Sequence, residues 1–215
     1  DTDGGYGAGY NDVADYNIGD QVPFKLIGTV PDMSRYTTYK YVFHDTASEG
    51  LTLPAKEGVK VYVADDKAGV KKTEITTFAK VDVSDQNLTV SFKDLKKVEG
   101  VSQGKSIIVE YSATLNSNAV IGLDGNTNAV NLEYSNNPNN SGEGEDTPTD
   151  RTPDDKVIVF TYGLDVTKVD SKNAETKLKD AEFKLKNSDD KWATITDGKV
   201  TGWADAEAQG SVLKS

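Results

Sequence analysis

The first 135 residues alternate between apolar and polar positions in short runs that turn residues separate. Alternation with a period of two is typical of β-strands that bury one face. The runs cover residues 22–30, 39–45, 59–63, 88–92, 107–115 and 128–134. No stretch keeps the period of 3.6 residues that an amphipathic helix requires. We therefore predict an all-β chain, built as a mostly antiparallel sandwich of the immunoglobulin-like type.

A polar segment at residues 136–155 interrupts this pattern. It contains no apolar residue and has three prolines, so it cannot bury enough surface to order itself and favours an extended tether. Alternation resumes at Lys156. We predict a first sandwich at 1–135, a linker at 136–155 and the N-terminal part of a second sandwich at 156–215. The last 60 residues are few for an independent domain, so we expect that second sandwich to be incomplete.

Composition narrows the function classes. The net charge of −11 repels phosphate backbones and anionic lipid, so nucleic acid and membranes are not expected partners. The chain has no cysteine, which excludes disulfides and fits a bacterial surface protein, although a cytosolic location stays open. The sequence has no nucleotide-binding, zinc-protease or thiol-nucleophile motif, so we expect no cofactor and no enzymatic turnover.

Histidines and pairs of acidic residues often take part in catalysis or metal binding, but here we expect neither role. The lone histidine, His44, falls on the strand face opposite its aromatic neighbours, and we predict a solvated side chain. The acidic pairs Asp65–Asp66 and Asp189–Asp190 lack the spaced oxygen donors of a calcium loop, so we interpret them as turn residues and expect no metal site.

Three polar residues lie on faces that should point inward. Asp45 shares its face with Tyr39, Tyr41 and Phe43, and Asn128 shares its face with Val130, Leu132 and Tyr134. Lys168 continues the apolar stripe that begins at Ile158. The alternative for Asp45 and Asn128 is that each lies at a strand end and escapes the core. The alternative for Lys168 is that it reaches solvent at the sheet edge, or that the strand ends before it.

Buried together, such groups could form a covalent bond. Burial drives a carboxyl and an amine toward their neutral forms. A neutral amine can attack the carbon of an asparagine amide, while a protonated carboxyl donates to the carbonyl oxygen and helps move protons. Ammonia leaves, and a Lys–Asn isopeptide bond remains. This reaction is a single maturation step and not enzymatic turnover.

The motifs around these residues resemble a known family. In the first sandwich they are similar to the isopeptide-forming second domain of Gram-positive, streptococcal-type backbone pilins. After the polar segment they resemble the opening of a collagen-adhesin B-type domain. The segments that carry the resemblance are Gly19–Phe24, His44–Leu51, Tyr111–Asn116 and Asn128–Pro138, then Phe160–Gly163, Lys168–Asp170 and Leu178–Phe183.

The resemblance implies a role for each candidate residue. Asp45 matches the family's assisting acid, Asn128 its isopeptide acceptor and Lys168 the isopeptide lysine of the B-type domain. The lysine that would join Asn128 is expected upstream of Asp1, and the glutamate and asparagine that would join Lys168 are expected beyond Ser215.

The resemblance also implies a function. We expect a shaft subunit of a cell-wall-anchored pilus, outside the cell, whose partners are other pilin subunits joined by sortase and, in addition, host surface or matrix molecules. The alternative is a surface adhesin module that binds a host matrix protein or glycan. A third option, an accessory domain of a carbohydrate-active enzyme, would need a pair of inward carboxylates, and the sequence has no such pair.

Overall fold

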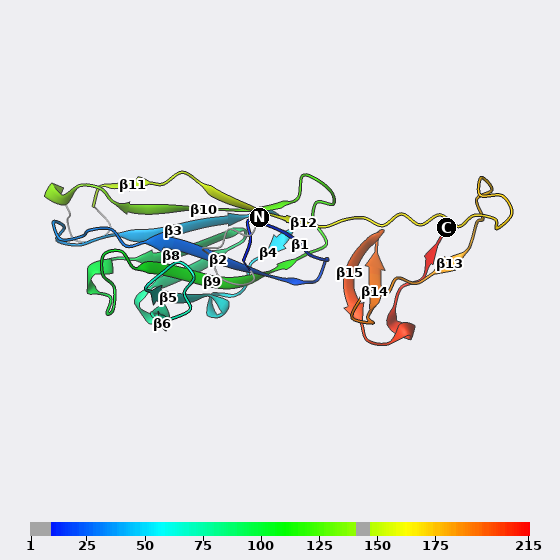
Figure 1. Ribbon diagram of the computed structural model, residues 1–215, viewed down its shortest axis with the longest axis horizontal. Helices are drawn as coiled ribbons and strands as arrows, with labels where there is room; N and C mark the ends of the chain where they lie inside the picture. The colour runs from blue at the N-terminus through cyan, green and yellow to red at the C-terminus, as the bar shows by residue number, and fades with distance from the viewer. Residues whose placement is uncertain (1–9, 141–146) are drawn as a thin grey trace.

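The computed structural model describes residues 10–140 and 147–215. Most of the chain up to Phe160 folds as two β-sheets that pack face to face, and the prediction of an all-β sandwich is confirmed (Figure 1). In the part of the chain that the structure describes, no helix is long and apolar enough to cross a membrane.

The larger sheet has seven strands. Its order is β1, β12, β10, β3, β8 and β7, and β11 also pairs with β10. These strands are β1 (Val13–Asp15), β3 (Tyr41–Ala47), β7 (Lys80–Ser84), β8 (Asn87–Phe92), β10 (Asn126–Ser135), β11 (Thr149–Arg151) and β12 (Asp155–Phe160). All neighbours are antiparallel except β1 and β12, which run parallel.

The smaller sheet has five antiparallel strands. Its order is β2, β9, β5 and β6, and β4 also pairs with β9. The strands are β2 (Gln21–Thr29), β4 (Leu51–Thr52), β5 (Lys60–Ala64), β6 (Lys72–Glu74) and β9 (Ser106–Leu115). Single 3-10 turns occupy the connections, at η1 (Lys56–Gly58), η2 (Thr76–Phe78), η3 (Leu95–Lys97) and η4 (Pro138–Asn140).

Strand β2 shows how alternation builds the sandwich. Val22, Phe24 and Leu26 are buried and face the other sheet. Pro23, which has no N–H to donate, is tolerated because β2 pairs with only one neighbour and forms the edge of its sheet. Gly28 packs against the other sheet, and a Cβ at this position would overlap the hydroxyl of Tyr41.

The structure differs from the predicted linker. Residues 149–151 form β11 against β10, and the strand that begins at Asp155 adds to the first sandwich through β10 and β1. That strand, β12, ends at Phe160. The polar composition of 136–155 concealed this pairing because the outer face of β10 offers ion-pair partners to Arg151 in place of apolar contacts. Residues 141–146 lie outside the described residues.

Beyond Phe160 the chain forms two small sheets. One pairs β13 (Glu182–Phe183) with β16 (Leu213–Lys214), and the other pairs β14 (Trp192–Thr196) with β15 (Lys199–Ala204); η6 (Glu207–Gln209) lies between β15 and β16. The segment that leads to them is exposed, with Tyr162, Leu164 and Val166 all at least half accessible. Figure 1 shows this part beside one end of the sandwich, where the Lys199 amine donates to the carbonyl of Ser117 at 3.0 Å.

Candidate functional site

Asp45 lies in the interior of the sandwich. It is in β3, where the alternate residues Tyr41, Phe43 and Ala47 face the core, and only 1% of its surface is accessible. The expectation that Asp45 points inward therefore agrees with the structure. A carboxyl in this position loses almost all of its hydration, which disfavours its charged form.

Asn128 lies beside it on the neighbouring strand. In β10, Asn128 pairs with Ala47, and Val130 pairs with Asp45, so the two polar side chains occupy adjacent positions on the inner face. Asn128 is 3% accessible. Its Nδ2 donates to Oδ1 of Asp45 at 2.7 Å. The structure thus brings together the two residues that the sequence singled out in the first sandwich.

Tyr111, which sequence reasoning did not single out, completes the site from the opposite sheet. It lies in β9, its ring stacks on Phe24, and its hydroxyl donates to Oδ2 of Asp45 at 2.6 Å. The same hydroxyl accepts from Nδ2 of Asn128 at 3.0 Å. The only sequence signal was a hydroxyl-bearing ring on the inward face of the strand, which is otherwise apolar. We call these three residues the buried cluster.

Burial controls the electrostatics of the buried cluster. It raises the pKa of Asp45 to about 6, even though the hydrogen bonds from Tyr111 and Asn128 act to lower it. Burial also raises the pKa of the Tyr111 hydroxyl, and the neighbouring charge of Asp45 adds to this effect. Asp45 is therefore poised to gain or lose a proton near neutral pH, as a proton-transfer group should be.

The two inward asparagines of β10 differ in one respect that matters chemically. Asn126 is fully buried, its Oδ1 accepts from the backbone N–H of Val120, and its Nδ2 donates to the carbonyls of Val120 and Val159. In Asn128 the Nδ2 donates two hydrogen bonds, whereas the buried Oδ1 has no hydrogen-bond partner among the described residues. Asn126 thus has all of its side-chain hydrogen bonds satisfied, whereas the carbonyl oxygen of Asn128 accepts none.

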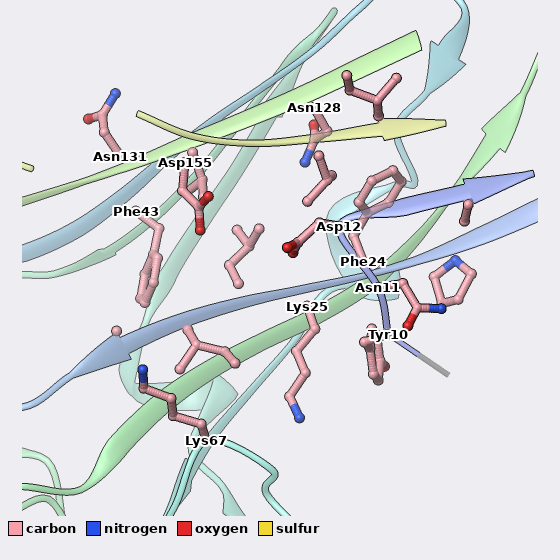
Figure 2. Close-up of a pocket in the computed structure, with 18 of the residues that line it drawn as sticks. Tyr10, Asn11, Asp12, Phe24, Lys25, Phe43, Lys67, Asn128, Asn131 and Asp155 are labelled. Atoms are coloured by element: carbon pink, nitrogen blue, oxygen red, sulfur yellow. The ribbon is translucent and has the colours of Figure 1, made fainter. Parts of the chain in front are cut away.

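Asn128 also lines a cavity of about 510 Å³ between the two sheets. Its walls come from β2, from β10 and from β1 and β12 at the edge of the larger sheet. Figure 2 shows Asn128 at this cavity, with the carboxylates of Asp12 and Asp155 also directed toward it. Lys25 extends away from Asn128, and its amine donates to the carbonyl of Ala68 at 2.7 Å. Lys25 therefore does not approach the Asn128 amide.

Lys168 lies apart from the buried cluster. It is exposed, and its amine donates to the carbonyl of Val169 at 3.2 Å. Since β12 ends at Phe160, the predicted inward stripe does not extend to Lys168 in this structure. The role of Lys168 in an isopeptide bond stays a prediction.

A second polar cluster lies on the outer face of the larger sheet, around Glu133. Its carboxylate contacts the Lys40 amine at 2.7 Å, Nε2 of His44 at 2.7 Å and the Arg151 guanidinium at 3.3 Å, and accepts from the Thr149 hydroxyl at 3.1 Å. Glu133 is only 8% accessible. His44, expected to be solvated, is half-buried because it pairs with this carboxylate.

The sandwich with a polar cluster sealed in its core defines a structural domain of the immunoglobulin-like class. Residues 18–138 match the family of the Gram-positive pilin backbone subunit 2, Cna-B-like domain. These residues make up more than half of the chain, and the chain belongs to this family.

Individual relatives agree with this assignment. The trypsin-resistant surface T6 protein of Streptococcus pyogenes is 26% identical over 202 residues, which cover 87% of this chain and 36% of that protein. The chain thus spans about a third of the length of this curated relative. The pilus 2b backbone protein of group B streptococcus has a similar fold, with a TM-score of 0.66 at 20% identity over 93% of this chain and 73% of that one. The major pilin subunit of Bacillus cereus gives a TM-score of 0.58 at 22% identity, over 95% and 52% of the two chains.

Proposed function

We propose that this chain is part of the shaft subunit of a covalently polymerised pilus on the surface of a Gram-positive bacterium. Its partners are further pilin subunits, joined by sortase, and the polymer is anchored to the cell wall. Membership of the pilin backbone family and the sandwich architecture support this function. The domain division that goes with it has a boundary after Phe160, where β12 leaves the first sandwich.

The buried cluster is the single observation that carries the proposal further. We propose that Asn128 accepts a lysine amine in an intramolecular isopeptide bond and that Asp45 assists. The amine attacks Cγ of Asn128, and the new C–N bond replaces the bond from Cγ to Nδ2. One proton of the amine passes through Asp45 to the departing nitrogen, which leaves as ammonia, so that Asp45 ends in its starting state.

We propose that the lysine lies on a strand upstream of Asp1 in the longer protein. No lysine precedes Lys25 in this sequence, and Lys25 is directed away from Asn128 (Figure 2). The cavity between β2 and β12 borders Asn128 and offers an approach to its carbonyl carbon. For the second domain, we propose Lys168 as the isopeptide lysine, with partners on strands that follow Ser215.

Intact-mass spectrometry of the folded longer protein tests this proposal. We expect a deficit of one ammonia for each bond, and Asn128→Ala should abolish the deficit of the first domain. Asn131→Ala is the matched control, because Asn131 lies on the same strand and donates to Asp154 at 2.9 Å, away from the buried cluster. The 215-residue chain alone should have the mass of its plain sequence. A folded longer protein without any deficit would overturn the isopeptide proposal.

A surface adhesin module is the second candidate, and one observation favours it. The loop between β9 and β10 exposes Val120, Ile121 and Leu123, the last at 88% accessibility. Exposed apolar residues in a group are typical of protein-binding surfaces. Binding of this chain to immobilised matrix proteins or glycans, abolished by Leu123→Ser, would support the adhesin function; the absence of binding would leave the shaft function alone.

A further inference from the structure

The hydrogen-bond arrangement of the buried cluster gives Tyr111 a specific task. The Tyr111 hydroxyl has one hydrogen, and it accepts from Nδ2 of Asn128, so its own hydrogen is directed to Oδ2 of Asp45. Both oxygens of the Asp45 carboxyl thus accept a hydrogen bond, Oδ2 from Tyr111 and Oδ1 from Asn128. Oδ1 is the oxygen that lies 2.7 Å from Nδ2 of Asn128.

We propose that Tyr111 is the positioning residue of the crosslinking site: its hydroxyl holds the carboxyl of Asp45 so that Oδ1 faces the departing amide nitrogen of Asn128. This inference rests on the proposed isopeptide function. The tyrosine touches no lysine and forms no bond. It acts by fixing which carboxyl oxygen of Asp45 faces the amide nitrogen.

The chemistry explains why this choice matters. After the amine has added to Cγ, the bond from Cγ to Nδ2 breaks only as Nδ2 takes up a proton and leaves as ammonia. A carboxyl whose Oδ1 already faces the departing nitrogen can pass on the proton that it takes from the amine without a change of rotamer, whereas a carboxyl turned away would first have to rotate. The tyrosine also holds Nδ2 from a second side, which leaves the Oδ1 atom of Asn128 directed away from the acid and without a partner.

The fold supports the rigidity that this task demands. Tyr111 is 4% accessible, its ring stacks on Phe24 with the ring centres 5.3 Å apart, and it reaches across from the opposite sheet. A hydroxyl held in this way cannot easily choose another acceptor. Tyr41 offers a contrast, because its buried hydroxyl donates to the backbone carbonyl of Thr29 at 3.1 Å and takes no part in the buried cluster.

The test compares Tyr111→Phe with Tyr41→Phe, since both remove one buried hydroxyl and keep the ring. Rapid refolding of the longer protein starts the reaction. Mass spectrometry then follows the appearance of the ammonia deficit with time, over a range of pH. We expect Tyr111→Phe to slow bond formation by roughly tenfold or more and to move the Asp45-dependent limb of the pH profile upward. Tyr41→Phe should leave both the rate and the profile unchanged.

A second measurement does not depend on the crosslink. The carboxyl of Asp45 is titrated by NMR in the 215-residue chain, with and without the Tyr111 hydroxyl. Because the hydrogen bond from Tyr111 lowers the pKa of Asp45, its removal should raise the midpoint. An unchanged midpoint, or a Tyr111→Phe protein that crosslinks at the wild-type rate and pH, would overturn the role of Tyr111. A wild-type protein that never crosslinks would instead overturn the proposed isopeptide function.

Discussion

Glu133 on the outer face of the larger sheet allows a quantitative prediction about stability. Burial raises the pKa of its carboxyl, but hydrogen bonds from Lys40 and His44 and the charge of Lys40 outweigh this effect and hold the pKa at about 2, against an ordinary value of 4.5. At about 1.4 kcal/mol per pKa unit, this difference corresponds to at most about 3 kcal/mol of stabilisation. Part of it is screened, because the Arg151 side chain is 54% exposed.

We therefore expect Glu133→Gln to lower the free energy of unfolding by about 2 kcal/mol at neutral pH. The neutral amide removes the negative charge that Lys40, His44 and Arg151 share, and the strand β11 loses its ionic attachment to β10. The direction of the pH dependence follows because the pKa of Glu133 is lower in the folded protein than in the unfolded one. The stabilisation is fully present above about pH 4.5 and disappears as the pH falls through about 2.

Urea denaturation of the 215-residue chain, followed by tyrosine and tryptophan fluorescence, measures this difference at about pH 7 and about pH 2. The two proteins should differ at the higher pH and converge at the lower one. Glu74→Gln is the control, since Glu74 pairs with Lys60 at 3.6 Å with both side chains about half exposed, and we expect an effect below about 0.5 kcal/mol. An equal loss for Glu133→Gln at both pH values would refute the electrostatic explanation.

Three further predictions concern the core. Asp45→Asn should stabilise the uncrosslinked chain by about 2 kcal/mol near pH 8. The pKa of Asp45 is raised to about 6, so stability is lost as wild-type Asp45 ionises. In the same denaturation assay, the gain should vanish as the pH falls below the ordinary pKa of 3.8. Gly28→Ala should cost about 3 kcal/mol in thermal or urea unfolding because its Cβ would overlap the Tyr41 hydroxyl, whereas Gly163→Ala, where the nearest atom is 3.5 Å away, should be close to neutral. Asn126→Ala should cost about 3 kcal/mol by calorimetry, since it orphans the buried N–H of Val120 and the carbonyls that Nδ2 satisfies; a loss below about 0.5 kcal/mol would show that those groups find other partners.

Alternation along the chain predicted much of the first sandwich, because side-chain direction in a strand is a local property. The inward positions of Asp45 and Asn128 followed from the same rule and agree with the structure. Their contact, by contrast, depends on the register between β3 and β10, which are about 80 residues apart along the chain. Before the structure was known, the inward positions suggested that such groups could react if buried together, and the resemblance to pilins assigned Asp45 and Asn128 to one site.

The failures have equally physical causes. The sequence pattern did not identify Tyr111 as a site residue, because a tyrosine on an inward face is normally part of the hydrophobic core. The acceptor of its hydroxyl hydrogen bond lies in the other sheet. The pairing of β11 and β12 with the first sandwich was not predicted. Arg151 joins the sheet through a buried carboxylate on β10, and a pattern of apolar residues does not reveal such an ion pair. Lys168 was placed inward by extending a strand that in fact ends at Phe160.

The way the chain enters and leaves the sandwich explains why a covalent bond at Asn128 would matter in a shaft. The chain enters through β1 and leaves through β12, and these strands run parallel, so tension between the chain ends shears their hydrogen bonds together. Among the described residues, β1 and β12 are joined by three residue pairs, from Val13 with Ile158 to Asp15 with Phe160. In the proposed pilus, a bond from the strand that precedes β1 to Asn128 would transfer the tension directly into β10, which is held between β12 and β3. The load would then bypass the short contact between β1 and β12, which places the crosslink where a shaft under tension needs it.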